Sequence, residues 1–480
     1  MNKKMVAFFL GHVLRIEAAL LVLPIIVSII YWEEDAIILA AIAALTYVGG
    51  LLMSAKKPAN TSFYTREGFV AVALSWLILS VIGALPFYFT KSIPSFTDAL
   101  FETVSGFTTT GASILSEVES ISKGVLFWRS FTHWIGGMGV LVFMLAILPF
   151  AEGDNIHIMR AESPGPSVGK LVPKVKSTAK ILYSMYIVIT LMEMIALKLS
   201  GMTLYESAVM TFGTVGTGGF AVLNSGCTGY TVLQQGIMTT FMIMCGVNFN
   251  AYFLLVTKKF KDALTSEEIL TYLGIIAFSA ITIAFNIREQ FDSIWMALHH
   301  GLFNVAACMT TTGFSSLDFN EWPTYSKMVL VTIMFVGGCA GSTAGGMKVS
   351  RIVIGFKTVK KELSHLIHPR SVKILKFDGK AIEHSVIRGV NVFIIAYFMI
   401  LFVSVLLVSL DGKDVVTTVT AVIATINNIG PGLGGVGPMS NFGSFSVFSK
   451  YILIFDMLAG RLELFPLLLL FMPRTWRRSS

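Results

Sequence analysis

Charged residues are scarce in this chain. Asp, Glu, Lys and Arg make up 13% of its 480 residues, against about 25% in a typical soluble protein. Hydrophobic residues make up 54%, so too few polar side chains remain to cover the surface of a soluble globule. The formal net charge is +8, yet the sequence offers no basic soluble face for nucleic acid. We therefore expect a polytopic membrane protein in contact with lipid, with its excess Lys and Arg on the cytoplasmic side.

Cysteine is also rare, and the residue clusters that enzymes and metal sites require are missing from the sequence. The four cysteines, Cys227, Cys245, Cys308 and Cys339, lie far apart, which gives neither a disulfide framework nor metal-ligand spacing. A membrane enzyme or an organic-solute carrier should show His, Asp, Glu or Cys gathered at one depth. These two classes are therefore the least favoured alternatives, and we expect no catalytic residue and no cofactor in the chain.

Long hydrophobic runs, by contrast, are abundant. A membrane helix needs about 20 mostly apolar residues. The N-terminal run is interrupted by Arg15 and Glu17, and we expect it to be a retained helix because no small-residue cleavage site follows. The run at 325–355 is too long and too rich in glycine for one plain helix. Ten stretches qualify as spans: 5–31, 36–54, 68–90, 124–150, 179–200, 231–257, 267–287, 325–355, 386–410 and 446–472.

The loops between these stretches predict their orientation. Every second loop is basic, and the cations assigned to these loops include Arg160, Lys170 and Lys174 after the fourth stretch, and Lys348 and Arg351 after the eighth. The intervening loops carry isolated cations. Cytoplasmic loops of membrane proteins are enriched in Lys and Arg, so we expect both termini in the cytoplasm.

Four shorter segments, 95–115, 203–222, 292–317 and 413–437, each lie between an outgoing and a returning helix. Each opens with residues suited to a helix N-cap, among them Ser95 and Thr203, and continues with an apolar helix too short to span. We therefore predict an all-α membrane protein with four parallel repeats of membrane helix, short helix, loop and membrane helix, after a leading helix pair. The predicted units are the leading pair at 1–60 and the repeats at 61–160, 161–262, 263–380 and 381–480.

The loops after the short helices read FTTTGASIL (107–115), GTVGTGGFAV (213–222), CMTTTGFSSL (308–317) and TINNIGPGLG (425–434). Glycine permits backbone angles that aim consecutive carbonyls one way, and rings of carbonyls can replace the hydration shell of a monovalent cation. The second loop has competing glycines at 216, 218 and 219. The predicted ion-binding residues are Thr109, Thr110, Gly111, Thr217, Gly218, Gly219, Thr311, Thr312, Gly313, Asn428, Ile429 and Gly430. A packing role for re-entrant hairpins is the alternative.

These four loops, in this order, resemble those of the Trk/Ktr/HKT superfamily of potassium transporters. HWIGGMG (133–139), GGCAGSTAGGMKVSR (337–351) and MLAGRLELF (457–465) resemble its TrkH branch, and the resemblance covers nearly the whole chain. It implies a pseudo-fourfold pore for K⁺ within one chain, whose selectivity filter is the set of loop residues above. It also implies a homodimer in the prokaryotic inner membrane, controlled by a cytoplasmic TrkA-type ring that binds nucleotides.

The resemblance also implies two gating elements. Arg461 falls in an otherwise apolar helix, where an ionisable residue indicates function, and in the family an arginine here lies in the permeation path. The alternative is a salt bridge to Glu463 or Asp456. The second element is the stretch 337–346, a flexible intramembrane gate in the family; close helix packing through small residues is the alternative. Its glycines are Gly337, Gly338, Gly341, Gly345 and Gly346.

Other polar residues suggest support for the loops. Glu102 and Asn304 occupy matching places on the first and third short helices when the loop glycines are aligned, and we expect them to brace the loops without touching the ion. Arg129 and Glu193 lie near helix ends, so we expect them to extend toward the membrane surface.

Two mechanisms other than a plain channel remain on the same fold. Proton- or sodium-coupled symport would usually need a carboxylate near the binding site, whereas these loops are neutral. A sodium-permeable pore is disfavoured by resemblance, because serine in the first loop accompanies sodium permeation in this family and glycine stands at all four aligned positions here.

Overall fold

The computed structural model describes residues 1–59, 64–139, 175–370 and 373–476. Some of the sequence predictions concern residues outside these ranges. They are the boundary between the first two repeats, the part of the 124–150 stretch after 139, and the cations Arg160, Lys170 and Lys174. In the described parts the strands are the antiparallel pair β1 (Lys376–Phe377) and β2 (Lys380–Ala381). The other regular elements there are helices, so the all-α prediction is confirmed.

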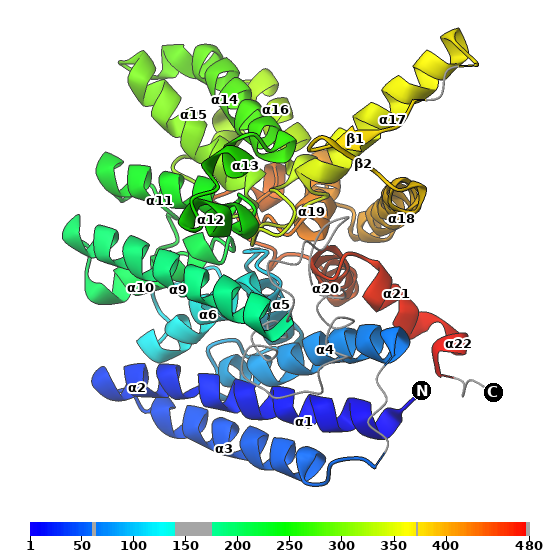
Figure 1. The fold of residues 1–480 in the computed structure, drawn as a ribbon. Helices are drawn as coiled ribbons and strands as arrows, with labels where there is room; N and C mark the ends of the chain where they lie inside the picture. Colours follow the sequence, from blue (N-terminus) through cyan, green and yellow to red (C-terminus); the bar gives the residue numbers. More distant parts are fainter. Residues whose placement is uncertain (60–63, 140–174, 371–372, 477–480) are drawn as a thin grey trace.

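The helices follow one another around the molecule (Figure 1). α20 packs on α5 and α21 packs on α4, so the last helices return to the first and close a circle. The α-helices are α1 (Lys3–Leu20), α2 (Val22–Ile30), α3 (Asp35–Ser54), α4 (Thr65–Phe89), α5 (Phe96–Phe107), α6 (Lys123–Gly137), α9 (Val175–Leu199), α10 (Leu204–Val215), α11 (Val232–Cys245), α12 (Phe249–Val256), α13 (Phe260–Leu264), α14 (Glu267–Ile287), α15 (Ile294–Met309), α16 (Thr324–Val336), α17 (Val349–Ile367), α18 (His384–Val408), α19 (Val415–Ile426), α20 (Val447–Arg461), α21 (Phe465–Phe471) and α22 (Pro473–Trp476). Within the described ranges, four single 3₁₀ turns lie between the helices: η1 (Arg288–Gln290), η2 (Phe319–Glu321), η3 (Ser409–Asp411) and η4 (Gly434–Val436).

Six of the described helical segments are long and apolar enough to cross a membrane, or seven if the bent pair α11–α12 counts as one span. In the segments Asp35–Ser54 and His384–Asp411, only 28% of the most apolar stretch is buried. Large exposed side chains such as Leu45, Phe402 and Leu406 cover their outer faces. Because an exposed apolar surface of this size is unfavourable in water, these faces contact lipid and the chain is a multi-pass membrane protein.

Three of the ten expected spans are broken. The stretch 231–257 bends by 91° between α11 and α12, and 446–472 breaks between α20 and α21, where Glu463 and Leu464 have positive φ. The prediction of one continuous helix in each of these two places is therefore wrong. In the stretch 325–355, α16 and α17 are separated by the non-helical residues 337–348, as its glycine content indicated.

Four short helices, α5, α10, α15 and α19, begin at capped N-termini. The hydroxyls of Ser95 and Thr203 accept from the backbone N–H three residues later, and Thr203 forms a full capping box with Glu206. Ser293 and Asp414 cap the other two. A side-chain cap satisfies N–H groups that have no partner in the helix, so the short helices begin where the sequence predicted.

Candidate ion pathway

The four loops after the short helices share one backbone conformation; they are called loop one (107–115), loop two (213–222), loop three (308–317) and loop four (425–434). In each, the second residue beyond the helix is left-handed, and the glycine two positions later also has positive φ. This places Gly219 in register with Gly111. The φ angles are 54° at Thr109, 54° at Thr217, 57° at Thr311 and 56° at Asn428, and 78° at Gly111, 79° at Gly219, 75° at Gly313 and 98° at Gly430.

The left-handed threonines are strained, because a β-branched side chain crowds the backbone in that region. Each such residue costs about 1–3 kcal/mol, and strain of this kind concentrates at functional sites. The turn follows a helix-ending motif in which N–H groups bond back to the last helical carbonyls. Thr110 N donates to Ser105 O, Gly218 N to Gly213 O and Ile429 N to Ala424 O, each at 2.8 Å. The same strain at equivalent places in three loops indicates a shared role.

The loops contact one another in a closed ring. A Cβ atom built on Gly111 would lie 2.0 Å from the carbonyl oxygen of Gly218, and one on Gly219 would lie 2.0 Å from that of Thr312. One on Gly313 would lie 1.9 Å from the carbonyl oxygen of Ile429. A Cβ atom built on Gly430 would lie 2.6 Å from the carbonyl oxygen of Thr110, so loop four contacts loop one and the ring is closed. Only glycine allows backbones to approach this closely. These contacts involve eight of the twelve sequence-predicted loop residues, and the other four are the left-handed residues that precede them in the same loops.

Loop one is held by a buried ion pair. Arg129 Nε donates to Glu102 Oε1 at 2.7 Å, and both side chains are almost fully buried. Glu102 also accepts from Ser113 Oγ and Ile114 N, both at 2.9 Å. The Arg129 guanidinium lies 3.5 Å from the ring centroid of Phe220 in loop two. Glu102 therefore braces the loop as expected, whereas the expectation that Arg129 extends to the membrane surface is wrong, because Glu102 draws it inward.

Neutral groups hold the next two loops. Asn304 donates through Nδ2 to Ser316 Oγ at 3.1 Å and accepts from Ser315 Oγ at 3.2 Å, so it braces loop three as expected. His133 on α6 lies between loops one and two: its Nδ1 is 2.8 Å from Gly106 O, and its Nε2 accepts from Phe220 N at 3.2 Å. Glu193 is also fully buried, contrary to the expectation from its place near a helix end.

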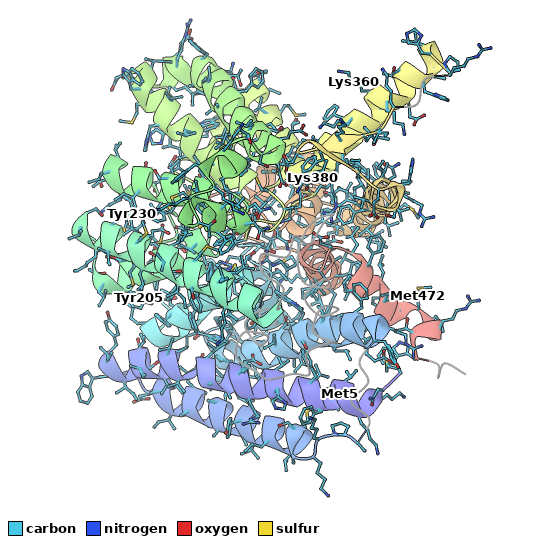
Figure 2. The ribbon with its side chains drawn as sticks, viewed as in Figure 1. Met5, Tyr205, Tyr230, Lys360, Lys380 and Met472 are labelled. Atoms are coloured by element: carbon cyan, nitrogen blue, oxygen red, sulfur yellow. The ribbon has the colours of Figure 1, made fainter. Side chains whose placement is uncertain are left out.

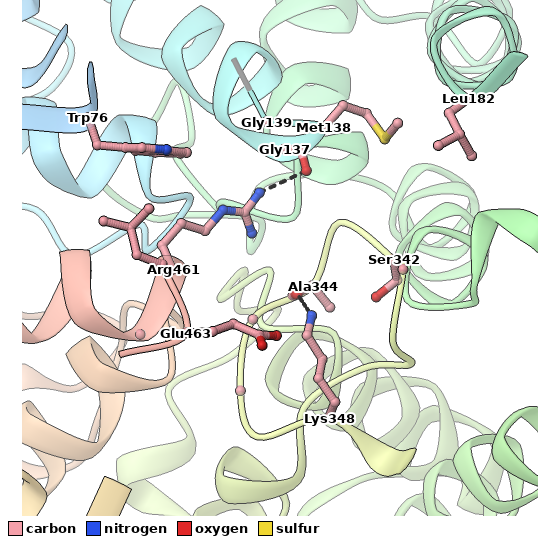
Figure 3. A pocket seen from close by; sticks show the side chains of 15 residues that line it. Trp76, Gly137, Met138, Gly139, Leu182, Ser342, Ala344, Lys348, Arg461 and Glu463 are labelled. Atoms are coloured by element: carbon pink, nitrogen blue, oxygen red, sulfur yellow. Dashed lines mark hydrogen bonds between the residues drawn. The ribbon is translucent and has the colours of Figure 1, made fainter. Parts of the chain in front are cut away.

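Two cavities lie on opposite sides of the ring. The first, of about 110 Å³, is lined by the ring glycines 111, 219, 313 and 430. The second, of about 80 Å³, is lined by Trp76, Gly137, Lys348, Arg461 and Glu463, among others (Figure 3). Its wall also includes Gly345 and Gly460. Gly460 lies against the carbonyl oxygen of Ile426, the last residue of α19, and Gly345 lies against that of Asn427, the next residue. We name it the Arg461 cavity. Each volume is large enough for several waters.

Arg461 reaches across the Arg461 cavity to backbone carbonyls. Its Nη1 donates to Thr343 O at 2.8 Å, and its Nη2 donates to Gly137 O at 2.7 Å and to Gly136 O. Glu463 is instead paired with Arg351, and Asp456 accepts from Ser404 Oγ at 2.7 Å. The guanidinium thus ties the end of α6 to the glycine-rich stretch.

The glycine-rich stretch 337–348 lies directly against the ring and is called the glycine loop. Gly345 N donates to Thr311 Oγ1 at 2.6 Å, and a Cβ atom on Gly345 would lie 2.5 Å from Asn427 O. Gly337, Gly341 and Gly346 have φ of 74°, 73° and 75°, and Gly338 accepts from Val349 N at 3.0 Å. The glycine loop is not helical, so the alternative of close packing between helices through small residues is wrong here.

Sequence reasoning missed three charged residues in or beside the glycine loop. Lys348 and Arg351 were assigned to a cytoplasmic loop, yet they are only 2% and 5% exposed. Glu268 at the start of α14 is buried and accepts from Ala340 N at 2.7 Å and Ser350 N at 3.1 Å. The signal available in the sequence was the GGMK junction, where a lysine stands two residues after a pair of glycines inside an apolar stretch.

Comparisons with known proteins point to one family. The family model TrkH, described as a cation transport protein, matches residues 34–478. The Trk system potassium uptake protein TrkH of Salmonella typhimurium is 34% identical over 486 residues, which cover 99% of this chain and all of that protein. TrkG of Escherichia coli, another Trk system potassium uptake protein, is 30% identical, with 99% of each chain covered. The crystal structure of the potassium transporter TrkH from Vibrio parahaemolyticus matches with a TM-score of 0.89 at 30% identity, covering 99% of this chain and 100% of that one. This chain belongs to the TrkH family of cation transport proteins.

Proposed function

We propose that this chain takes up potassium across a prokaryotic inner membrane through a gated, channel-like pore. The observation that carries the proposal is the closed ring of four loops between two cavities. The relatives of the chain are named as potassium uptake proteins or potassium transporters. In this reading K⁺ passes from the cavity lined by the ring glycines to the Arg461 cavity, and loop carbonyls replace its hydration shell.

The proposed filter consists of residues 109–111, 217–219, 311–313 and 428–430. It belongs to four repeats, α4–α6, α9–α12, α14–α17 and α18–α21. They follow the leading pair of spans, which consists of α1 with α2 and of α3. The ring offers neutral oxygens, and each short helix directs its partly negative C-terminal end toward it, which favours a cation. A filter of neutral oxygens binds an ion without taking up a proton, so it supports conduction over proton-coupled carriage.

The proposed gate consists of Arg461 and the glycine loop. A fixed positive charge in the Arg461 cavity opposes the passage of K⁺, and the loop fills the space next to Thr311 and Asn427. Arg461 donates to Thr343 in this loop, so the two parts of the gate are joined. Opening would require the loop to leave the ring and the guanidinium to give up its carbonyl partners.

The proposed assembly is a homodimer bound to a TrkA-type cytoplasmic ring that binds nucleotides, with both termini in the cytoplasm. Lys360 on α17 lies at the same end of the molecule as Met5 and Met472, whereas Tyr205 and Tyr230 lie at the opposite end (Figure 2). The place of Lys360 at the end that carries the termini agrees with this orientation. Co-purification of the chain with a TrkA-type protein, and the mass of the detergent-solubilised particle, would test the assembly.

Thallium entry into proteoliposomes tests the pore directly, because Tl⁺ substitutes for K⁺. We expect saturable entry that K⁺ inhibits more strongly than Na⁺, and faster entry for Arg461→Ala with the same order of inhibition. The absence of saturable entry in both the natural chain and Arg461→Ala would contradict the pore.

Gly313→Ser tests the ring. The added Cβ would lie 1.9 Å from Ile429 O and 2.9 Å from Pro431 Cδ, so loops three and four must move apart. We expect at least about a tenfold loss of the preference for K⁺ over Na⁺, the factor that ~1.4 kcal/mol produces. Gly201→Ser is the matched control, because Gly201 also has positive φ, 101°, but nothing lies within 4 Å of the new Cβ. An unchanged preference in Gly313→Ser would remove loop three from the filter.

A further inference from the structure

We propose that Lys348 is a latch that holds the glycine loop against the ring and adds a second positive charge to the Arg461 cavity. The inference rests on the proposed pore and adds a positioning residue to its gate. Lys348 directly follows Gly346 and Met347 and immediately precedes α17. It lines the same cavity as Arg461.

The position of Lys348 is costly in two ways. Its backbone is left-handed, with φ of 76°, which costs about 1–3 kcal/mol for a residue other than glycine. Its side chain is buried, and burial of an ammonium group is unfavourable unless partners compensate. Glycine would adopt this backbone conformation without strain, and leucine could be buried here without the cost of removing a charge from water. The lysine at this place therefore calls for an explanation through its charge.

The Lys348 ammonium holds the second half of the glycine loop, residues 344–346, in place. Lys348 Nζ donates to Ala344 O (Figure 3), one residue before Gly345, which bonds to Thr311 in the ring. The first half is fixed separately: Cys339 N donates to Gly246 O at 2.9 Å, and Phe249 N donates to Gly341 O at 3.0 Å. Residues 344–346 are thus tied to α17 mainly through Lys348.

Charges on three elements face the ammonium. The groups that interact with it electrostatically are Glu463, Arg461, Arg351 and Glu268. Figure 3 shows the Glu463 carboxylate directed toward Lys348, while the same carboxylate is paired with Arg351 on α17. A displacement of α17 would move Lys348 and Arg351 together, because they are three residues apart at its start. This links the helix to both parts of the gate.

The test removes the charge and keeps the shape. Lys348→Met has a side chain of similar length without the ammonium, and Lys348→Arg retains the positive charge as the control. In proteoliposomes without any partner protein, we expect thallium entry to rise about tenfold in Lys348→Met, the factor produced by ~1.4 kcal/mol. The K⁺ over Na⁺ preference should stay the same, and Lys348→Arg should remain close to the natural chain.

A cysteine in the second half of the glycine loop reports whether Lys348 holds that half in place. In a chain that carries Ala344→Cys and has alanine at 227, 245, 308 and 339, a water-soluble thiol reagent should label position 344 faster once Lys348→Met is added. A chain that keeps Cys339 alone is the control, and it should label at an unchanged rate, because the first half of the loop is fixed separately at Gly246 and Phe249. Equal acceleration at both positions would indicate general loosening and overturn the latch, as would unchanged entry and labelling. Faster labelling at position 344 with no thallium entry in any variant, Arg461→Ala included, would support the latch and contradict the pore.

Discussion

Loops one and three have the same Thr-Thr-Thr-Gly sequence, yet different chemistry holds them in place. Behind loop one lies the ion pair of Glu102 and Arg129, with both charges buried. Behind loop three lies the amide of Asn304 with two serines. The backbone angles at Thr109 and Thr311 differ by only 3°, from 54° to 57°. The ring therefore requires a given loop shape but accepts either a charged or a neutral brace.

The two braces should respond differently to damage. A buried ion pair that loses one partner leaves an uncompensated charge, which typically costs about 3–5 kcal/mol. A neutral hydrogen-bonded network that loses one member costs about 1–3 kcal/mol. Loop one should thus be the more sensitive of two loops with nearly identical shape.

Arg129→Met should have the largest effect. It leaves Glu102 buried without its cation and also removes the contact between the guanidinium and Phe220 in loop two. We expect a loss of about 3–5 kcal/mol of stability, measured by unfolding in detergent, and loss of saturable thallium entry. Arg288→Met is the control: the Arg288–Glu289 pair is exposed, with side chains 61% and 88% accessible, so it should cost at most about 1 kcal/mol. Equal costs for the two variants would contradict the brace.

The loops and the short helices could be predicted from sequence because local rules determine them. Ser95 and Thr203 mark helix starts, and the glycines at 111, 219, 313 and 430 occupy positions where the backbone must be left-handed. The same rules indicated that 325–355 would break. The competing glycines of loop two are resolved only by the three-dimensional ring, where Gly219 meets Thr312 O.

The charged residues could not be placed because their partners are distant in the chain. Arg351 pairs with Glu463, 112 residues away, and Glu268 bonds to Ala340, 72 residues away. Composition rules treat a lysine beside an apolar stretch as a loop cation, and Lys348 breaks that rule. The break at Glu463 and Leu464 was also missed, because neither residue is a usual helix breaker.

Asn304→Ala should have an intermediate effect. It removes the donor and the acceptor that hold Ser315 and Ser316, so we expect a loss of about 1–3 kcal/mol, read from the same detergent unfolding. The K⁺ preference should fall, because loop three would be free to shift. Asn286→Ala is the control, since Asn286 is exposed and accepts a single bond from Ser326 at 2.8 Å. A cost for Asn304→Ala as large as that for Arg129→Met would remove the distinction between charged and neutral braces.

The smallest effect should come from two hydroxyl pairs, one in loop one and one in loop three, which differ from each other in a single bond. Thr108 and Thr110 hydroxyls lie 2.8 Å apart, and those of Thr310 and Thr312 lie 2.7 Å apart. In loop one, however, Thr110 Oγ1 also accepts from Asn428 Nδ2 of loop four at 3.0 Å.

Thr312→Val should therefore cost about 0.5–1.5 kcal/mol, the worth of one hydrogen bond. Thr110→Val should cost about 1 kcal/mol more, because a second bond is lost and the Asn428 amide is left with one partner. Because that bond joins loops one and four, only Thr110→Val should also weaken the K⁺ preference. The difference between these two variants in one unfolding series measures how far two loops with the same sequence are distinguished by their neighbours alone, and identical values would mean that the bond from Asn428 contributes nothing to the ring.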